Sequence, residues 1–433
     1  ANSAGELPVN PVGARKAWTF LFYNVGQGNL APMTTASLES LERVGSNEQT
    51  DVVALNYRER PGHERALGRF AEYEGARCYH LTRGKSAGSW LGPELGSLAD
   101  CALASPKGLQ SQVIGQPVGP GESARMADPA TLKAFLIENM ARFPAEHFAL
   151  TITGHGAAFQ GQAIVRGPQG RSAISNDDLG RVLREVAQET GQSVDLVNLN
   201  TCYSANLESL YSLKDATRAL VASQAALSLG TQPFAAVLAE VQQRLAAGSS
   251  VSPQDLARVF VDQSARQPLS GLYSPTLSAI DPAGLGELGQ SLAALQGACQ
   301  QQGIEPKALR ECLSQALGID FSGPVQLTDL GSLAGVISER IDNQKVREAA
   351  ARVVADLRAS VLGEQHAESG QQSWLESGMR RIPFLVGPQK DLTGASGLTV
   401  FWNPEEKERL ALIEGSSFGK DHPAGRFMEY LAS

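Results

Sequence analysis

The sequence lacks the features that mark several large classes of protein. It has five cysteines in 433 residues, widely spaced and without a C-x-x-C pair, which argues against a disulfide framework and a zinc motif. It contains no run of Lys and Arg, and its net charge is −8, which argues against nucleic-acid binding. No apolar run approaches the roughly 18–20 residues of a membrane-spanning helix. The hydrophobic content of 42% is ordinary for a globular protein, so the chain can bury a sizeable core.

The start of the chain carries little information. Residues 1–16 are rich in Gly, Pro, Ala and Asn, and we expect them to form a flexible tail. The chain begins without Met and without an apolar signal core, so we expect that a leader has been removed or that the chain has been trimmed. The sequence therefore leaves both a secreted or periplasmic and a cytoplasmic location open, and it assigns no oligomeric state.

From residue 17 to about 235, patterns of buried strands alternate with patterns of amphipathic helices. Strands are expected at 17–25, 51–58, 78–83, 147–156, 194–199 and 218–226, and helices at 127–144, 175–191 and about 206–215. This alternation predicts an α/β domain with a mostly parallel sheet. Residues 84–124 are expected to be loop. Residues 236–433 are expected to form a helix-rich region, whose strand at 397–404 packs back on the core.

Two chemically interesting side chains follow consecutive predicted strands. His155 lies in a Gly-His-Gly turn, and Cys202 lies 47 residues later, just after the strand at 194–199. Consecutive strands are usually neighbours, and the chemistry of parallel sheets gathers at the carboxyl ends of the strands. Taken singly, such a cysteine is ordinarily a small buried hydrophobe, and such a turn is common. Together, the two positions indicate a Cys–His pair.

Such a pair is suited to nucleophilic catalysis. The thiolate is the reactive form of cysteine, and a nearby histidine can take its proton and later protonate a leaving amine. We expect the helix that follows Cys202 to favour a thiolate through its N-terminus. Gly156 has no side chain, so the backbone there can approach a substrate carbonyl closely. Backbone N–H groups at these turns can hold a developing oxyanion.

Five segments between about residues 17 and 430 carry a resemblance to a known family. They are WTFLFYNVGQGNL, RMADPATLKAFLIENMARFPAEHFALTITGHG, VDLVNLNTCYSANLESLYSLKDATRALVASQ, YSPTLSAID at 273–281 and SGLTVFWNP at 396–404. They resemble the clostripain-like cysteine peptidases, a branch of the caspase–gingipain–legumain fold. The resemblance implies a caspase-like α/β/α sandwich in which residues 17–235 form the catalytic domain. It also implies Cys202 as nucleophile, His155 as general acid and base, and the N–H groups of Gly156 and Cys202 as oxyanion hole.

The chain departs from this family where residue preference is set. Members often carry Asp two residues before the cysteine, and this chain has Asn200 at that position. Members also often carry an acidic residue after the Val-Ala-Ser-Gln strand, and the corresponding segment here, SQAALSLGTQ, is neutral. Asn200, Ser223 and Gln224 are the candidate specificity-pocket residues. A buried cation without a carboxylate partner is costly. We therefore expect cleavage after a neutral or small residue rather than after Arg or Lys.

Family members are often activated by self-cleavage in the loop after the histidine. Here Arg166 and Arg171 are the candidate cleavage sites, and a merely solvated loop is the alternative. We find no dense acidic loop, so we predict no metal and no cofactor. The expected partner is a protein or peptide substrate.

Two other functions compete with the endopeptidase hypothesis. Because the pocket acids are missing, the fold could serve as a catalytically silent binding or scaffold module. The same dyad could also perform another acyl transfer, such as transpeptidation. The presence of both His155 and Cys202 favours the endopeptidase.

Overall fold

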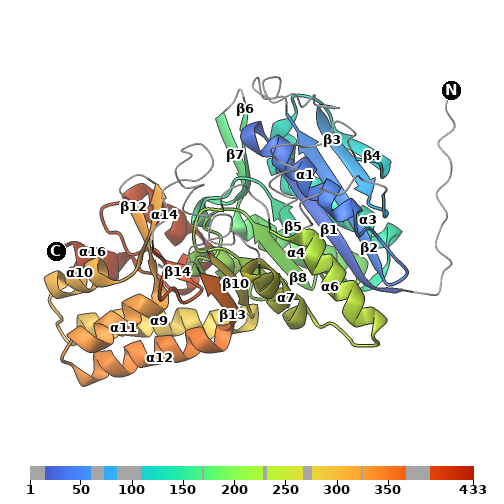
Figure 1. Ribbon diagram of the computed structural model, residues 1–433. Coiled ribbons are helices and arrows are strands. Elements are labelled where there is room, and N and C mark those ends of the chain that lie inside the picture. Colours follow the sequence, from blue (N-terminus) through green and yellow to red (C-terminus); the bar gives the residue numbers. More distant parts are fainter. Residues whose placement is uncertain are drawn as a thin grey trace.

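A large mixed sheet runs through the centre of the molecule. The computed structural model describes residues 15–59, 73–84, 109–167, 170–227, 232–266, 276–322, 325–366 and 391–433. Within these residues, nine strands form the sheet in the order β13-β10-β9-β8-β5-β1-β2-β3-β4 (Figure 1). They are β1 (Lys16–Gly26), β2 (Thr50–Arg58), β3 (Gly75–His80), β4 (Gln112–Val118), β5 (Ala145–Thr153), β8 (Leu196–Asn200), β9 (Ala219–Ala222), β10 (Thr276–Ile280) and β13 (Val361–His366).

The five central strands, β9, β8, β5, β1 and β2, are parallel. At each edge, two further strands pair in the antiparallel sense. Parallel neighbours need crossover connections, which the helices between them supply. The predicted mostly parallel α/β sheet is therefore confirmed at its centre.

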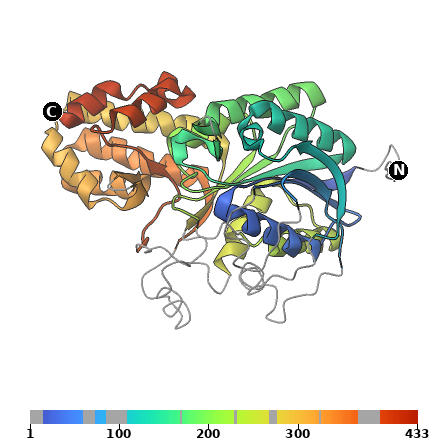
Figure 2. The same ribbon diagram turned by 90° about the horizontal axis from the view of Figure 1, so that it is seen from above.

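Helices cover both faces of this sheet (Figure 2). α3 (Pro129–Arg142) and α4 (Asn176–Thr190) lie on one face, and α1 (Ala31–Glu42), α6 (Phe234–Ala246) and α7 (Pro253–Ala265) lie on the other. Side chains alternate along β1 between the two faces. Leu21, Tyr23 and Val25 join the core under α3 and α4, whereas Trp18, Phe20 and Phe22 join the core under α1, α6 and α7.

The helices on the α3 and α4 face follow the signals in the sequence. The Asp128 side chain accepts a hydrogen bond from the N–H of Ala130 at the start of α3, with proline at the first helical position. Ser175 caps α4 by accepting from the N–H of Asp178. The apolar stripes expected for both helices are buried. Both predicted helices are confirmed, with ends within about two residues of the predicted ones.

The C-terminal part forms a second layer of helices beside the sheet (Figures 1 and 2). Its helices are α9 (Leu285–Gln301), α10 (Pro306–Gln315), α11 (Leu330–Arg340), α12 (Gln344–Ser360), α14 (Lys407–Gly415), α15 (Ser417–Asp421) and α16 (Gly425–Ala432). A small sheet of β11 (Gly318–Ser322), β12 (Val325–Asp329) and β14 (Thr399–Val400) lies among them. The N–H of Thr399 donates to the carbonyl of Ala205, which joins β14 to the segment after β8.

The structure also contains strands that the sequence analysis assigned to other elements. β4 lies in the stretch expected to be loop, and β10, β11 and β12 lie in stretches expected to be helical. The central sheet takes β10 and β13 from beyond residue 235. These strands are only five to seven residues long, and their apolar runs are too short to distinguish a strand from a helix by periodicity. Among the described residues, no helix is both long and apolar enough to cross a membrane.

Candidate active site

Cys202 lies in a turn at the carboxyl end of a buried strand. All five residues of β8 are buried, whereas Cys202 is partly exposed. The next helix, α5 (Leu207–Leu210), is only four residues long and continues into a 3-10 turn at Tyr211–Leu213, where a single longer helix was expected. It begins five residues after Cys202. Because the field of a helix terminus acts mainly within its first turn, the expected help from a helix N-terminus is not available to this thiol.

His155 lies in the corresponding turn after β5. It is exposed to solvent, and its carbonyl accepts a hydrogen bond from the N–H of Ile164 at 2.9 Å. Ile164 belongs to β6 (Gln162–Gly167), which pairs with β7 (Gly170–Ile174) in a hairpin that projects away from the sheet (Figure 1). The histidine turn is therefore held from one side by β5 and from the other by this hairpin.

The strand register brings the two turns together. β5 and β8 are parallel neighbours in which Thr153 pairs with Asn200, and Asn200 Nδ2 donates to Thr153 Oγ1 at 3.3 Å. His155 and Cys202 each lie two residues beyond this pair, so they leave adjacent strands at the same level. Adjacent strands are about 4.8 Å apart. The prediction that the strands before His155 and Cys202 are neighbours is confirmed.

Gly156 lies in close contact with the turn that contains Cys202. A Cβ atom at this position would lie 2.6 Å from Thr201 Cβ and 2.8 Å from Gln162 Oε1. Such distances are far shorter than van der Waals contact, so only glycine fits without displacing its neighbours. The two turns can therefore lie this close together only because Gly156 has no side chain.

The surroundings shift the pKa values of the Cys202 thiol and the His155 ring toward the neutral forms. Burial raises the pKa of Cys202, and backbone hydrogen bonds at Leu227 and at Cys202 itself offset this only partly. Although His155 is exposed, contact with the protein removes part of its solvation and lowers its pKa, and the positive charges of Arg166 and Arg171 lower it further. Sγ lies 4.0 Å from the Leu227 carbonyl oxygen, and no hydrogen bond joins it to His155 in the described part of the chain. The thiol and the imidazole therefore do not form a preformed ion pair.

The predicted pocket residues are held inside the protein. Asn200, Ser223 and Gln224 are all buried. Ser223 Oγ lies 2.9 Å from Thr276 Oγ1, and the Gln224 amide donates to Asp329 and accepts from the N–H of Gly397. Ser223 and Gln224 would contact a substrate only if their neighbours moved.

Asp329, which the sequence analysis did not single out, lies next to Gln224. It is completely buried at the N-terminus of α11, where it accepts hydrogen bonds from Gln224 Nε2, from the N–H groups of Ser332 and Ser396, and from Ser396 Oγ. These four donors occupy both of its oxygens. It offers no free oxygen to a cationic substrate side chain. Its place before an apolar helix was the available sequence signal, because Asp favours N-caps.

Aromatic side chains pack together beside Cys202. Tyr203, the residue after Cys202, packs edge-on against Phe321 with ring centroids 5.1 Å apart. Phe159, four residues after His155, contacts both Phe321 and Phe401. Tyr203 and Phe159 are partly exposed, so they present apolar surface next to the two turns. Burial raises the pKa of Tyr203 to about 12, with smaller effects from Cys202 and the exposed Asp320.

The candidate self-cleavage sites lie in the β6–β7 hairpin. Arg166 and Arg171 face each other across its two strands. The Gln27 side chain makes two hydrogen bonds with the Arg166 backbone. Its Nε2 donates to the Arg166 carbonyl and its Oε1 accepts from the Arg166 N–H, each at 2.7 Å. Gln27 Nε2 also donates to Glu59 at 2.5 Å. Both arginines therefore belong to ordered, paired strands.

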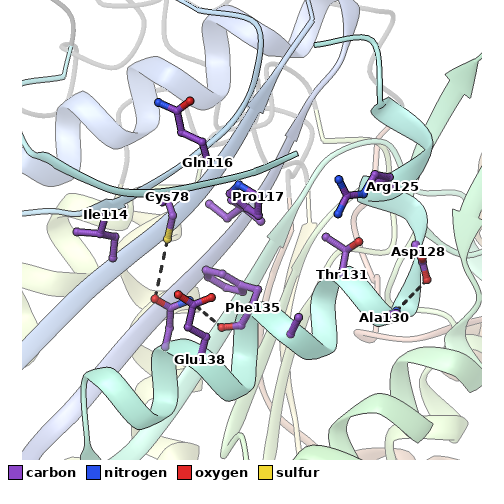
Figure 3. A pocket seen from close by; sticks show the side chains of 14 residues that line it. Cys78, Ile114, Gln116, Pro117, Arg125, Asp128, Ala130, Thr131, Phe135 and Glu138 are labelled. Carbon is purple, nitrogen blue, oxygen red and sulfur yellow. Dashed lines mark hydrogen bonds between the residues drawn. The ribbon is translucent and has the colours of Figure 1, made fainter. Parts of the chain in front are cut away.

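The other described cysteines are poor nucleophiles. Cys78, Cys299 and Cys312 are buried free thiols, and burial raises their pKa values, those of Cys78 and Cys299 to about 12. Cys101 lies outside the described residues. Cys78 lines a cavity of about 440 Å³ between β4 and α3, shown in Figure 3 with Phe135 and Glu138 of α3 facing it. This cavity is separated from β8 by β5 and β1 in the sheet, so it is distinct from the Cys202 turn.

No metal site is evident within the described part of the chain. No group of three or more His, Cys, Asp and Glu side chains there is arranged to hold an ion.

Comparison with known proteins extends this description. A family model described as the clostripain family matches residues 111–396, about two thirds of the chain. A comparison with curated protein sequences found no match. Among solved structures, a secreted C11 cysteine protease from Bacteroides thetaiotaomicron, in complex with an irreversible peptide inhibitor, has a TM-score of 0.62 and 13% identity, covering 94% of this chain and 99% of its own. An inactive zymogen C11 protease from Parabacteroides distasonis has a TM-score of 0.60 and 12% identity, covering 95% and 99%. These structural similarities show a shared fold.

Proposed function

This chain belongs to the clostripain family of cysteine peptidases, and we propose that it is an endopeptidase with Cys202 as nucleophile and His155 as general acid and base. The observation that carries the assignment is the β5–β8 register, which sets both residues two positions beyond the paired Thr153 and Asn200. A protein or peptide is the proposed substrate.

The proposed reaction has two halves. Sγ of Cys202 attacks the scissile carbonyl carbon while its proton passes to the neutral His155 ring. The oxyanion that forms accepts hydrogen bonds from the N–H groups of Gly156 and Cys202, which donate to no carbonyl oxygen within the described residues. His155 then protonates the leaving amine, and a thioester remains on Cys202. In the second half, His155 takes a proton from water, the hydroxide attacks the thioester, and the proton returns to Sγ as the acid product leaves.

Replacement of the nucleophile tests this assignment. Cys202→Ala is expected to lower peptide cleavage by several orders of magnitude while leaving the thermal unfolding midpoint close to that of the wild type. Cys78→Ala, which removes a thiol in the cavity of Figure 3, serves as the matched control and should retain cleavage. Cleavage by the Cys202→Ala variant at the wild-type rate would refute the proposed nucleophile.

For the residue before the scissile bond, we favour a neutral, apolar side chain. Three features support this preference: Asn200 is an amide, the Asp329 carboxylate is saturated by four donors, and Tyr203 presents an aromatic ring beside Cys202. An Arg or Lys side chain would find no free buried carboxylate among these groups. A peptide library varied at this residue should show higher kcat/KM for apolar residues than for Arg and Lys. The reverse order would refute the preference.

Self-cleavage at Arg166 or Arg171 requires the hairpin to open first. A peptidase binds its substrate as an extended segment, whereas both arginines are paired in β6 and β7 and the Arg166 backbone is held by Gln27. We therefore propose that the intact chain is the stable form. Purified wild type and Cys202→Ala, incubated side by side and resolved on a denaturing gel, should both stay intact. Fragments that end at either arginine in the wild type alone would overturn this.

The competing function is a catalytically silent binding module. It is favoured by the protonated thiol, which lies against the Leu227 carbonyl rather than against His155. A peptide carrying a thiol-alkylating group distinguishes the two functions. Labelling of Cys202 that is lost in His155→Ala supports the endopeptidase, whereas no labelling and no cleavage of any library peptide supports the binding module.

A further inference from the structure

A chain of buried amide and hydroxyl groups joins the two turns of the proposed dyad. Thr201 Oγ1 donates to Gln162 Oε1 at 2.5 Å, Gln162 Nε2 donates to Asn176 Oδ1 at 3.1 Å, and Asn176 Nδ2 donates to the Ala158 carbonyl at 3.1 Å. Thr201 immediately precedes Cys202, and Ala158 lies three residues after His155. We call Thr201, Gln162 and Asn176 the Thr–Gln–Asn relay. Its side chains come from three separate segments of the chain.

The direction of every hydrogen bond in the relay follows from its last acceptor. The Ala158 carbonyl can only accept, so Asn176 must present its NH₂ group to it and its Oδ1 to Gln162. Gln162 must then present Nε2 to Asn176 and Oε1 to Thr201, which leaves the Thr201 hydroxyl as the donor. Thr201 and Gln162 are almost completely excluded from water. Because a lost partner would leave a buried polar group unpaired, the arrangement has one favourable state.

The relay packs directly against the backbone of the histidine turn. Thr201 Cβ, Thr201 Oγ1 and Gln162 Oε1 are the three atoms that a Cβ on Gly156 would meet, all within 2.9 Å. The Cys202 N–H belongs to the peptide group that follows Thr201, and the Gly156 N–H belongs to the peptide group that follows His155. The relay therefore contacts Gly156 directly and is bonded to Cys202 through the Thr201 backbone, so it joins the two residues that carry the proposed oxyanion donors.

Three residues near the relay have backbone conformations that are unfavourable for residues other than glycine. Three non-glycine residues have positive φ angles in the described chain: Ala158 at 49°, Ala163 at 51° and Tyr203 at 58°. Ala158 accepts the last hydrogen bond of the relay, Ala163 follows Gln162, and Tyr203 follows Cys202. Such conformations persist only where the surroundings hold them. All three therefore lie in the segments that the relay joins.

We propose that Gln162 is a positioning residue that sets the distance and orientation between the Cys202 turn and the His155 turn. This role rests on the proposed peptidase function, but it assigns no chemistry to Gln162 itself. Gln162 acts through Thr201 on one side and through Asn176 on the other. Its loss should misplace the catalytic groups without removing any of them.

The test uses variants of nearly constant shape, of which Thr201→Val removes one hydrogen bond of the relay and Gln162→Met removes two. Thr201→Val and Gln162→Met are expected to lower kcat roughly 10- to 100-fold with KM within about twofold, because small misplacements of reacting groups have effects of this size. Thr201→Ser keeps the hydroxyl and should restore kcat to within about threefold of the wild type. The double variant Thr201→Val/Gln162→Met should be no slower than the slower single variant, because both belong to one network.

A second buried amide pair provides the matched control. Asn198 of β8, four residues before Cys202, exchanges two hydrogen bonds with Gln232, at 2.8 and 3.1 Å. Gln232→Met should lower the unfolding midpoint about as much as Gln162→Met but leave kcat unchanged. An equal loss of kcat in both variants would show a merely structural role and overturn the proposal, as would a wild-type kcat in Thr201→Val and Gln162→Met.

Failure of the relay and failure of the function give different results. If Cys202→Ala abolishes cleavage while Thr201→Val and Gln162→Met cleave normally, the relay role is wrong and the peptidase stands. If Cys202→Ala still cleaves, the proposed function itself is wrong. In Gln162→Met, iodoacetamide should still alkylate Cys202, because the thiol itself is retained. Complete protection of the thiol would contradict a positioning role.

Discussion

Adding a single methyl group at Gly156 should separate the two turns of the active site. In Gly156→Ala, the new Cβ would start 2.6 Å from Thr201 Cβ, 2.8 Å from Gln162 Oε1 and 2.9 Å from Thr201 Oγ1. Carbon atoms in contact prefer about 3.5–4.0 Å, so the turns must move apart by about 1 Å. Overpacking of this kind costs about 1–3 kcal/mol of folding free energy. A displacement of about 1 Å at the catalytic groups should lower kcat/KM by roughly 100-fold.

The measurement pairs peptide cleavage with thermal unfolding. Gly335→Ala serves as the control, because Gly335 lies in helix α11 with no atom within 4 Å of the added Cβ. That variant should keep wild-type kcat/KM and gain up to about 1 kcal/mol of stability from the better helix propensity of Ala. Wild-type cleavage in Gly156→Ala would show that the contact between Gly156 and Thr201 does not control the catalytic geometry. The reasoning from steric distance would then be wrong.

Two further predictions concern pH. Desolvation and the charges of Arg166 and Arg171 lower the pKa of His155. Replacing both arginines with Gln should therefore raise this pKa. On acidification, kcat/KM should then begin to fall at a higher pH than in the wild type. An unchanged acid limb would count against His155 as the base. Arg125→Gln, which removes one positive charge at the cavity of Figure 3 away from His155, is the control and should leave the acid limb in place. Burial raises the pKa of Glu208 from 4.5 to about 7. The folded state therefore binds a proton on Glu208 more tightly than the unfolded state does. As a result, the free energy of unfolding should fall by up to about 3 kcal/mol as the pH rises from about 4.5 to 7. Urea unfolding at pH 5 and pH 8 should show this fall in the wild type and a flatter dependence in Glu208→Gln; equal slopes would refute it.

Much of the site's framework could be predicted because it is local. The strand patterns before His155 and Cys202 and the capped helices α3 and α4 depend on residues close in sequence, where alternation and capping are direct signals. The expectation that the two strands are neighbours was confirmed by the Thr153–Asn200 register. The helix expected at about 206–215 begins where it was expected, after the Asn206 cap, but it is shorter, because α5 ends at Leu210 and a 3-10 turn follows to Leu213.

The side chains that reach the candidate site from distant parts of the sequence could not be predicted in the same way. Asp329 reaches Gln224 across 105 residues, and Phe321 and Phe401 reach the catalytic turns from the C-terminal part. Single amide, carboxylate and aromatic side chains have no periodic pattern, so their partners cannot be inferred from spacing. Only the packing of distant segments makes these contacts.

The sequence by itself determined the fold class, the family resemblance and the two residues proposed to carry the chemistry, because strand and helix patterns and the placement of His155 and Cys202 are properties of short segments. The tertiary structure alone decided how the two turns meet. Thr201, Gln162 and Asn176 come from the turn after β8, from β6 and from α4, and Gly156 is required because Thr201 and Gln162 occupy the space beside it. The physical reason is that a buried hydrogen bond or a steric contact exists only when both partners are brought within a few ångströms, and here it is the folded sheet that does so.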